Sequence, residues 1–250
     1  MADKSPNRTL YDYIETVKPL RDFNDHFYVS FKHRYAFHTV GKAANSTVKH
    51  TFYRYELRDT HYRLPSVHVR LCSPLLSPFQ LDERLLREIF FGRSFFRFTF
   101  IRNPYSRLLS CYLDRIKNMK SRPYIELIGG MGKSTGYDPS FEEFITFICR
   151  QDVHAQNNHW RVQTADALCG LIDYDFIGRQ EQFSVDLDEV YTRITGQQLS
   201  QAELSENASP ALTGASAQLT QFWTEPLIEL VQNKYRADFE VLGYDRELPS

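Results

Sequence analysis

A lysine in a turn of small residues is the first feature of this sequence that could do chemistry. An apolar segment precedes Lys42, and small or polar residues follow it, at Ala43, Ala44, Asn45, Ser46 and Thr47. Small side chains let the backbone approach an anion, the free amides at the start of a helix point towards it, and the lysine adds a full positive charge. The segment predicts a phosphate or sulfate site. The alternative is an ordinary capped helix with a solvated lysine.

This turn differs from the Walker A loop of nucleotide triphosphatases. That loop has a glycine five positions before its Gly-Lys pair and a hydroxyl residue directly after the lysine. Ala36 and Ala43 occupy those two positions here. The sequence therefore disfavours a nucleotide or small-molecule kinase, which stays an alternative because it would share a phosphate-loop fold.

An arginine and a serine eight positions apart form a second polar pair. Arg102 follows an apolar run, Pro104 favours the first turn of a helix, and Ser110 comes about two turns into that helix. A guanidinium can hold a phosphate through two hydrogen bonds, and a serine hydroxyl can donate another to the same group. The alternative is an arginine paired with a carboxylate and a serine without function. Without other evidence, Arg102 and Ser110 favour this structural alternative over a phosphate site.

The elements that must position these residues alternate between strands and helices. Aromatic and β-branched runs predict strands at residues 34–40, 66–71, 95–101 and 174–177. Periodicity predicts helices at residues 46–57, 82–90, 105–118, 141–150, 184–195 and 219–241, the last bent or restarted at Pro226. This order predicts an α/β fold, in which a P-loop-like parallel sheet has helices on both faces and binds ligands beyond the carboxyl ends of its strands.

The composition limits the class of protein. A chain of 250 residues with 42% hydrophobic content is long enough for one large domain. Its 30 basic and 31 acidic residues nearly balance, so a basic site must be local and nucleic-acid binding is not expected. The first thirty residues hold no apolar run that suits a signal peptide or a membrane span, which predicts a cytoplasmic protein. The four cysteines form no CxxC pair, so neither zinc nor a disulfide is expected.

Taken together, the two polar motifs resemble those of a known enzyme family. The Lys42 turn and the run Arg-Asn-Pro-Tyr-Ser-Arg-Leu-Leu-Ser at residues 102–110 are similar to the 5'-phosphosulfate and 3'-phosphate motifs of sulfotransferases that use 3'-phosphoadenosine 5'-phosphosulfate (PAPS). Their order and spacing both fit. The chain most resembles sulfotransferase family 2, the carbohydrate sulfotransferases of the chondroitin 4-O type.

Further stretches extend the resemblance over residues 33–244. They are a histidine segment at 67–71, a His-Trp pair at 159–160, a Leu-Cys pair at 168–169, the run Asp-Tyr-Asp-Phe-Ile-Gly-Arg-Gln-Glu at 173–181, and a closing helix with a Gly-Tyr end at 243–244. The resemblance implies one sulfotransferase domain at residues 33–250, after an N-terminal extension at residues 1–32. The family's membrane anchor and stem are missing, which favours a soluble enzyme of bacterial type.

The resemblance also implies a reaction and roles for its residues. A sulfuryl group would pass from PAPS to a hydroxyl, leaving PAP, and no metal would be required because protein cations neutralise the leaving group. Lys42 would contact the bridging and sulfuryl oxygens, while Arg102 and Ser110 would hold the 3'-phosphate. The 5'-phosphate end would be bound by the turn and helix start, at Ala43, Ala44, Asn45, Ser46 and Thr47.

An unactivated sugar hydroxyl needs a general base, and a histidine with a pKa of about 6.5 suits that role. His68 is the first choice, because it lies between the two motifs and matches the family's histidine segment. A surface or structural role is its alternative. His159, in the polar run Asn-Asn-His-Trp, is the rival and could instead orient the acceptor.

The expected partner is a carbohydrate acceptor. The same chemistry on a lipid or on a small hydroxylated metabolite is an alternative, because acceptor pockets lie in variable loops such as residues 120–137 and 205–216. A further alternative is a module that binds PAP-like nucleotides or sulfated glycans without turnover. The sequence specifies no oligomeric state.

Overall fold

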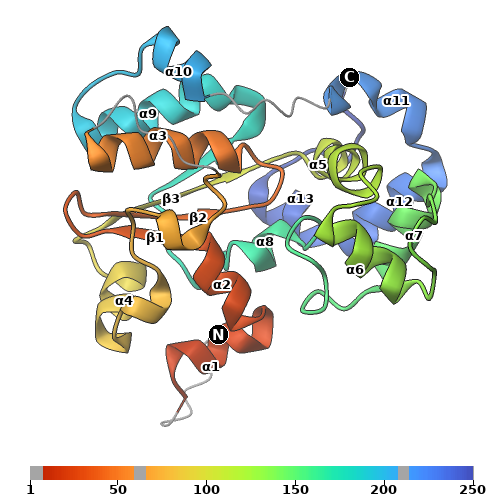
Figure 1. The fold of residues 1–250 in the computed structure, drawn as a ribbon, viewed down its shortest axis with the longest axis horizontal. Coiled ribbons are helices and arrows are strands. Elements are labelled where there is room, and N and C mark those ends of the chain that lie inside the picture. Colours follow the sequence, from red (N-terminus) through yellow and green to blue (C-terminus); the bar gives the residue numbers. More distant parts are fainter. Residues whose placement is uncertain (1–7, 59–65, 208–213, 250) are drawn as a thin grey trace.

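A four-stranded sheet lies at the centre of the protein, in a computed structural model that describes residues 8–58, 66–207 and 214–249 (Figure 1). Its strands follow the order β1 (Phe27–Ser30), β2 (Tyr35–Thr39), β3 (Phe96–Ile101) and β4 (Phe176–Arg179). Strands β2, β3 and β4 are parallel, and β1 is antiparallel to β2. The predicted α/β class is confirmed, with a mostly parallel sheet flanked by helices in a single domain.

Helices make up most of the remaining described chain. The α-helices are α1 (Leu10–Val17), α2 (Leu20–His26), α3 (Asn45–Leu57), α4 (Glu83–Phe91), α5 (Pro104–Cys111), α6 (Arg122–Gly130), α7 (Phe141–Arg150), α8 (Gln163–Asp166), α9 (Phe183–Thr195), α10 (Gln201–Asn207), α11 (Leu219–Phe222), α12 (Glu225–Lys234) and α13 (Arg236–Leu242). Short 3-10 helices are η1 (Arg70–Cys72), η2 (Pro78–Gln80), η4 (Gln180–Gln182) and η5 (Ala215–Gln218), and η3 (Tyr112–Ile116) is a π-helix. No helix in these described stretches is long and apolar enough to cross a membrane.

Alternating side chains give the sheet two apolar faces. One face, with Tyr35 and Phe37 of β2, packs against α3 and α9. The opposite face, with Phe27 and Val29 of β1, packs against α1, α2 and α4 (Figure 1). Covering both faces leaves the ends of the strands as the place where polar side chains can meet.

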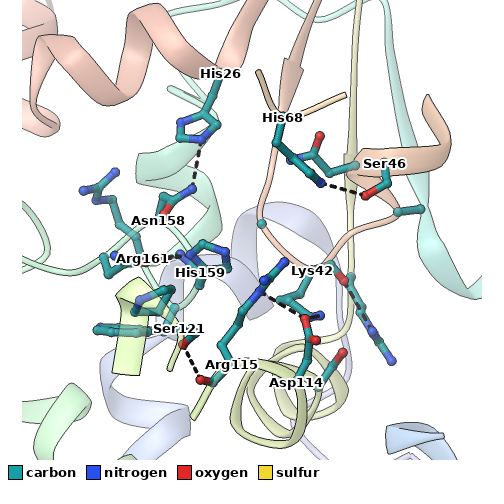
Figure 2. A pocket seen from close by; sticks show the side chains of 18 of the residues that line it. His26, Lys42, Ser46, His68, Asp114, Arg115, Ser121, Asn158, His159 and Arg161 are labelled. Carbon is teal, nitrogen blue, oxygen red and sulfur yellow. Dashed lines mark hydrogen bonds and ion pairs between the residues drawn. The ribbon is translucent and has the colours of Figure 1, made fainter. Parts of the chain in front are cut away.

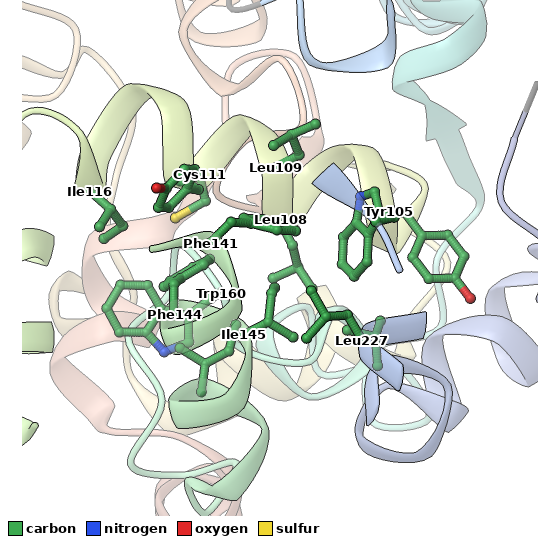
Figure 3. Packing of buried hydrophobic residues seen from close by; sticks show 14 of the residues in the cluster. Tyr105, Leu108, Leu109, Cys111, Ile116, Phe141, Phe144, Ile145, Trp160 and Leu227 are labelled. Carbon is green, nitrogen blue, oxygen red and sulfur yellow. The ribbon is translucent and has the colours of Figure 1, made fainter. Parts of the chain in front are cut away.

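A third apolar cluster packs around α5 (Figure 3). Leu108 and Leu109 of α5 lie with Phe144 and Ile145 of α7 in this cluster. Trp160 belongs to it as well, since it is only 1% exposed and its ring lies 5.9 Å from that of Phe144. The cluster holds α5 firmly, and α5 begins three residues after the end of β3.

Some predicted elements are wrong. Residues 66–71 form a turn and the start of η1 instead of a strand, because only Val67 of their apolar side chains is buried and Leu71 is 98% exposed. The helix predicted at 105–118 changes to a π-helix at Tyr112. The helix predicted at 219–241 is divided into α11, α12 and α13, with extended backbone at Trp223 and a break at Tyr235. The strands predicted at 34–40, 95–101 and 174–177 are confirmed.

Three parts of the structure had no counterpart in the predicted elements. Strand β1 pairs with β2, and Lys18 of the supposed N-terminal extension is fully buried in an ion pair of 2.9 Å with Asp166. Helix α6 occupies half of the loop expected at 120–137. Helix α10 reaches Asn207, and positions 208–213 of the other expected loop lie outside the described residues.

Candidate functional site

A cavity of about 1460 Å³ lies at the carboxyl ends of the parallel strands (Figure 2). Nearly all the site residues expected from the sequence line it: Lys42, Ala44, Asn45, Ser46, Thr47, His68, Arg102, Ser110 and His159. Ala43 is the exception, because it is 1% exposed and packs behind the turn against Val40 and Ala167. The structure thus brings residues of four separate segments, at 42–47, 68, 102–110 and 159, to one place.

The turn between β2 and α3 has the backbone shape of an anion site. Lys42 and Ala44 have positive φ angles of 68° and 56°, on either side of Ala43. Such alternation directs successive amide N–H groups towards one point. Helix α3 begins at Asn45, and its N-cap residue, Ala44, offers no side-chain acceptor to the first free amides of the helix. Free amides at a helix start can bind an anionic group such as a phosphate.

Gly41 and Arg107 hold this turn against the loop that carries His159. A Cβ atom on Gly41 would lie 2.8 Å from the Asn158 carbonyl oxygen and 3.1 Å from the His159 Cα. The fully buried Arg107 donates from Nε to the Gly41 oxygen at 2.9 Å and from Nη2 to the Asn158 oxygen at 3.1 Å. The sequence analysis assigned no role to Arg107. Its contacts make it a positioning residue for both segments.

The Lys42 ammonium is paired inside the cavity (Figure 2). Its Nζ donates to Asp114 Oδ2 at 2.6 Å, and Arg115 Nε lies 3.1 Å from the same oxygen. Asp114 and Arg115 belong to the π-helix η3, a type of turn that is frequent at functional sites. The sequence analysis missed both residues. Asp114 comes four positions after Ser110, a spacing that places two side chains on one helical face and could have indicated it.

Arg102 carries a buried charge that forms no ion pair with a carboxylate of the described residues. Its Nε donates to Ser106 Oγ at 3.1 Å, and its Nη1 donates to the Lys42 carbonyl oxygen at 3.3 Å. Burial lowers the pKa of Arg102 to about 10, while the more distant Glu181 acts in the opposite direction. No carboxylate of the described chain forms an ion pair with this guanidinium. The site therefore fits an anion, and Ser110 lines the same cavity two helical turns away.

The two candidate bases differ in their hydrogen bonds. His68 Nε2 lies 3.1 Å from Ser46 Oγ. His159 Nδ1 lies 2.8 Å from Asn157 Oδ1, and the Asn157 amide nitrogen donates to Glu126 at 2.5 Å, which fixes the orientation of Asn157. His159 Nδ1 therefore carries the ring proton, and Nε2 keeps its lone pair.

Both of these imidazoles are neutral at pH 7. Burial lowers the pKa of His159 well below its ordinary value, and Arg115 lowers it further. His68 faces the open cavity, but partial withdrawal from water, together with nearby cations, lowers its pKa to about 4. Neutral rings are the form in which a histidine can accept a proton.

A buried charge network lies behind the His159 loop. Asp166 Oδ1 accepts from Lys18 at 2.9 Å and from Arg161 at 3.0 Å, and Arg161 also donates to Asp22 at 2.6 Å. Although burial raises the pKa of Asp166, the charges of Lys18 and Arg161 hold it well below its usual range. The network joins α1 and α2 to the loop before α8, so the N-terminal segment helps to position the site.

His26 supports the same loop as a neutral residue. Its Nδ1 donates to the Asp22 carbonyl oxygen at 2.7 Å, and its Nε2 accepts from the Asn158 amide at 2.9 Å. Burial, followed by the charge of Lys18, lowers the pKa of His26 to about 4. Asn158 is thereby held directly before His159.

The wall of the cavity is positively charged. It contains eight basic side chains, Arg21, Lys42, Lys49, Arg70, Arg102, Arg115, Arg122 and Arg161, and four acidic ones, Asp22, Asp25, Asp114 and Glu126. The difference of eight minus four is an excess of four positive charges in a chain whose formal net charge is −1. The basic site is local, as the composition predicts. Within the described ranges, no three His, Cys, Asp or Glu residues are grouped to hold a metal ion.

Comparison with known proteins gives the chain a family. Carbohydrate sulfotransferase 14 of Homo sapiens and of Mus musculus are each 30% identical to it over 177 residues, which cover 66% of this chain and 45% of theirs. Carbohydrate sulfotransferase 11 of Rattus norvegicus is 29% identical over 117 residues, covering 39% of this chain and 32% of that protein. The chain therefore matches less than half the length of these relatives. No solved structure matches it.

The family match covers both anion sites and the strands that carry them. It runs from residue 25, just before β1, to residue 245, just after α13. The resemblance inferred from the motifs is thereby confirmed, and this chain belongs to the sulfotransferase family.

Proposed function

We propose that this protein transfers a sulfuryl group from PAPS to a hydroxyl group of a carbohydrate. Membership of the sulfotransferase family supports sulfuryl transfer, and the names of the relatives support a carbohydrate acceptor. One observation carries the proposal of the donor. The Lys42 turn, with the uncapped start of α3, and the Arg102 guanidinium line the same cavity, so that a molecule with two separate phosphate positions can bridge them.

Each end of the donor has its own group of residues in this proposal. The amides and hydroxyls at residues 43–47 bind the 5'-phosphate, while Arg102 and Ser110 bind the 3'-phosphate. Lys42 leaves Asp114 and places its ammonium beside the bridging oxygen. It stabilises the negative charge that develops there as the bond from sulfur to the leaving oxygen breaks.

His159 is the better prepared base of the two histidines. Its Nε2 forms no hydrogen bond with any described residue, whereas His68 Nε2 is engaged with Ser46 Oγ. The acceptor's hydroxyl proton passes to His159 Nε2 while the acceptor oxygen bonds to sulfur, and the electron pair of the broken bond stays on the 5'-phosphate. His68 then orients the Ser46 hydroxyl within the phosphate site.

The experiment that tests this function begins with PAP, because PAP binding needs no acceptor. We expect calorimetric titration to show PAP binding that Arg102→Ala weakens, and ATP with magnesium to bind less well. Radiolabelled PAPS should then transfer its label to members of a carbohydrate panel. Tighter binding of ATP than of PAP would favour the kinase alternative, and PAP binding without transfer to carbohydrate, lipid or small-molecule hydroxyls would favour a binding module.

A further inference from the structure

The backbone of Arg102 lies just beyond the sheet and is held there by one side chain. Strand β3 ends at Ile101, the last residue of β3 that pairs with β4. The Arg102 N–H donates to Gln163 Oε1 at 2.9 Å, and the Arg102 carbonyl oxygen accepts from Gln163 Nε2 at 2.8 Å. Buried backbone groups need such partners, and here one side-chain amide supplies both. Gln163 therefore fixes the point at which the Arg102 side chain leaves the backbone.

The orientation of the Gln163 amide is determined by its surroundings. Its Oε1 faces a backbone N–H, while its Nε2 faces two oxygens, the Arg102 carbonyl oxygen at 2.8 Å and Asp238 Oδ2 at 3.4 Å. A rotated amide would place its oxygen against these two acceptors and its NH2 group against a donor. Gln163 is fully buried and does not line the cavity, so it can affect a bound ligand only through other residues.

A buried carboxylate near the end of the chain holds Gln163 in turn. Asp238 of α13 is fully buried and accepts from the backbone amides of Gln163 and Thr164, each at 2.9 Å. These amides are the first two of α8, and the start of a helix favours a negative charge. Asp238 thereby fixes the main chain of Gln163 at the distance from which its side chain spans the Arg102 backbone.

The Arg102 guanidinium depends on the position of this backbone. Its Nε donates to Ser106 Oγ at 3.1 Å, and its Nη1 donates to the Lys42 carbonyl oxygen at 3.3 Å. Two parallel hydrogen bonds from a guanidinium to a phosphate require a defined distance and angle. A displacement of the Arg102 backbone would therefore change the geometry with which the guanidinium meets a phosphate.

We propose that Gln163 is a positioning residue that makes the donor site selective for a nucleotide with a 3'-phosphate. The inference rests on the proposed function and adds a residue that determines specificity without touching the donor. The proposed contacts of the 5'-phosphate come from residues 43–47, in a different loop. Loss of the Gln163 amide should therefore weaken binding of the 3'-phosphate and leave binding of the 5'-phosphate intact.

The test compares the affinities of the full chain for PAP and for adenosine 5'-phosphate (AMP), which lacks only the 3'-phosphate. The ratio of the AMP Kd to the PAP Kd measures recognition of that phosphate. Gln163→Met keeps the length of the side chain and removes its amide. In calorimetric titrations it should raise the Kd of PAP about tenfold or more and that of AMP by less than about twofold, because a small misplacement affects only the group that is held precisely.

Gln156→Met is the matched control. Gln156 is 1% exposed, and its side-chain amide also binds two backbone groups, accepting from the Val162 N–H at 3.1 Å and donating to the Ile148 carbonyl oxygen at 3.0 Å. Neither bond involves Arg102. This variant should lose stability as Gln163→Met does, measured by urea denaturation, and should keep the wild-type ratio of the two Kd values.

A double-mutant cycle tests whether Gln163 acts through Arg102. Arg102→Ala removes the guanidinium, so Gln163→Met should cause no further fall in the Kd ratio in this background. A further fall would show that Gln163 reaches the 3'-phosphate by another route, which would overturn the inference.

The outcomes separate this role of Gln163 from the proposed function. A wild type that binds PAP no better than AMP would count against the proposed donor itself. A preference for PAP that Gln163→Met retains, or an equal loss of affinity for both nucleotides, would overturn the role of Gln163 alone. If Gln163→Met does not fold, Asp238→Asn decides the question. It keeps the shape of the side chain with one acceptor oxygen in place of two, so the ratio should fall less steeply, and an unchanged ratio would overturn the inference.

Discussion

Lys42 and Asp114 show how one residue of the site depends on another far along the chain. In the structure, the Lys42 ammonium donates to Asp114 at 2.6 Å, across 72 positions of sequence. The proposed donor requires the same ammonium. In this proposal the donor and Asp114 compete for the Lys42 ammonium. Substitutions of Lys42 and of Asp114 should therefore have opposite effects on donor binding.

Lys42→Met should affect the rate more than donor affinity. The ammonium is proposed to act on charge that develops during transfer, so we expect kcat to fall by about 100-fold or more, while the Kd of PAP rises by less. Steady-state rates with PAPS and calorimetry with PAP measure the two quantities. An equal loss of both would indicate a residue that only binds the donor.

Asp114→Asn should release Lys42 and strengthen PAP binding by about threefold to tenfold, because the competing carboxylate is lost. The effect should vanish in the Lys42→Met background, where no ammonium is left to release. Calorimetry on the four members of this double-mutant cycle gives the coupling between the two positions. An unchanged effect of Asp114→Asn in the Lys42→Met background would show that Asp114 acts independently of Lys42.

At the scale of elements, the close approach of two loops sets the geometry of the site. The β2–α3 turn touches the His159 loop at Gly41, and Arg107 of α5 holds the carbonyl oxygens of both. Helix α5 is itself capped by the Asn103 side chain, which accepts from the backbone amides of Tyr105 and Ser106. The site is thus supported by one well-anchored helix between two loops.

Gly41→Ala should separate these loops. Its Cβ would meet the Asn158 backbone, which has little room to move, so we expect a loss of about 1–3 kcal/mol in unfolding free energy and weaker PAP binding. Urea denaturation and calorimetry measure these effects. Gly129→Ala in α6 is the matched control, because no atom lies within 4 Å of its added Cβ and alanine favours a helix. Equal behaviour of the two variants would contradict the packing argument.

At the scale of the whole molecule, the N-terminal segment, the sheet and the loop before α8 form one electrostatic unit. Lys18, Asp22 and His26 come from the first thirty residues, and they contact Asp166, Arg161 and Asn158, respectively, far along the chain. The network has buried charges and a buried neutral histidine. The stability of the molecule should therefore depend on pH.

Stability should decrease as the pH falls from about 6.5 to about 4. The folded pKa of His26 is about 4 and its unfolded value is about 6.5, so the unfolded chain binds more protons in this range. Each such histidine contributes a slope of at most about 1.4 kcal/mol per pH unit. Urea denaturation from about pH 4.5 to about pH 7 gives the unfolding free energy at each pH. This free energy should depend less steeply on pH in His26→Gln than in the wild type. Equal slopes for the wild type and for His26→Gln would refute the assignment.

Local signals in the sequence predicted much of the fold and of the donor site. The apolar run before Arg102 and the proline after it determine where β3 ends and α5 begins, because strand periodicity and a proline in the first helical turn act over a few residues. The small residues after Lys42 likewise predicted the start of α3 to within one position. Strand β1 was missed because four buried residues without flanking turn residues do not distinguish a strand from any other buried segment.

The family motifs and the α/β class were thus determined by the sequence itself, since they depend on neighbouring residues. Only the tertiary structure decided that Asp114 pairs with Lys42, that Arg107 joins two loops and that Lys49 is buried against Tyr28. Each of these depends on which segments pack together, and the Asp114 pair also depends on a local switch from α- to π-helix. The packing of distant segments determines which side chains are buried and which charges pair. The periodicity of a single segment carries no information about that packing.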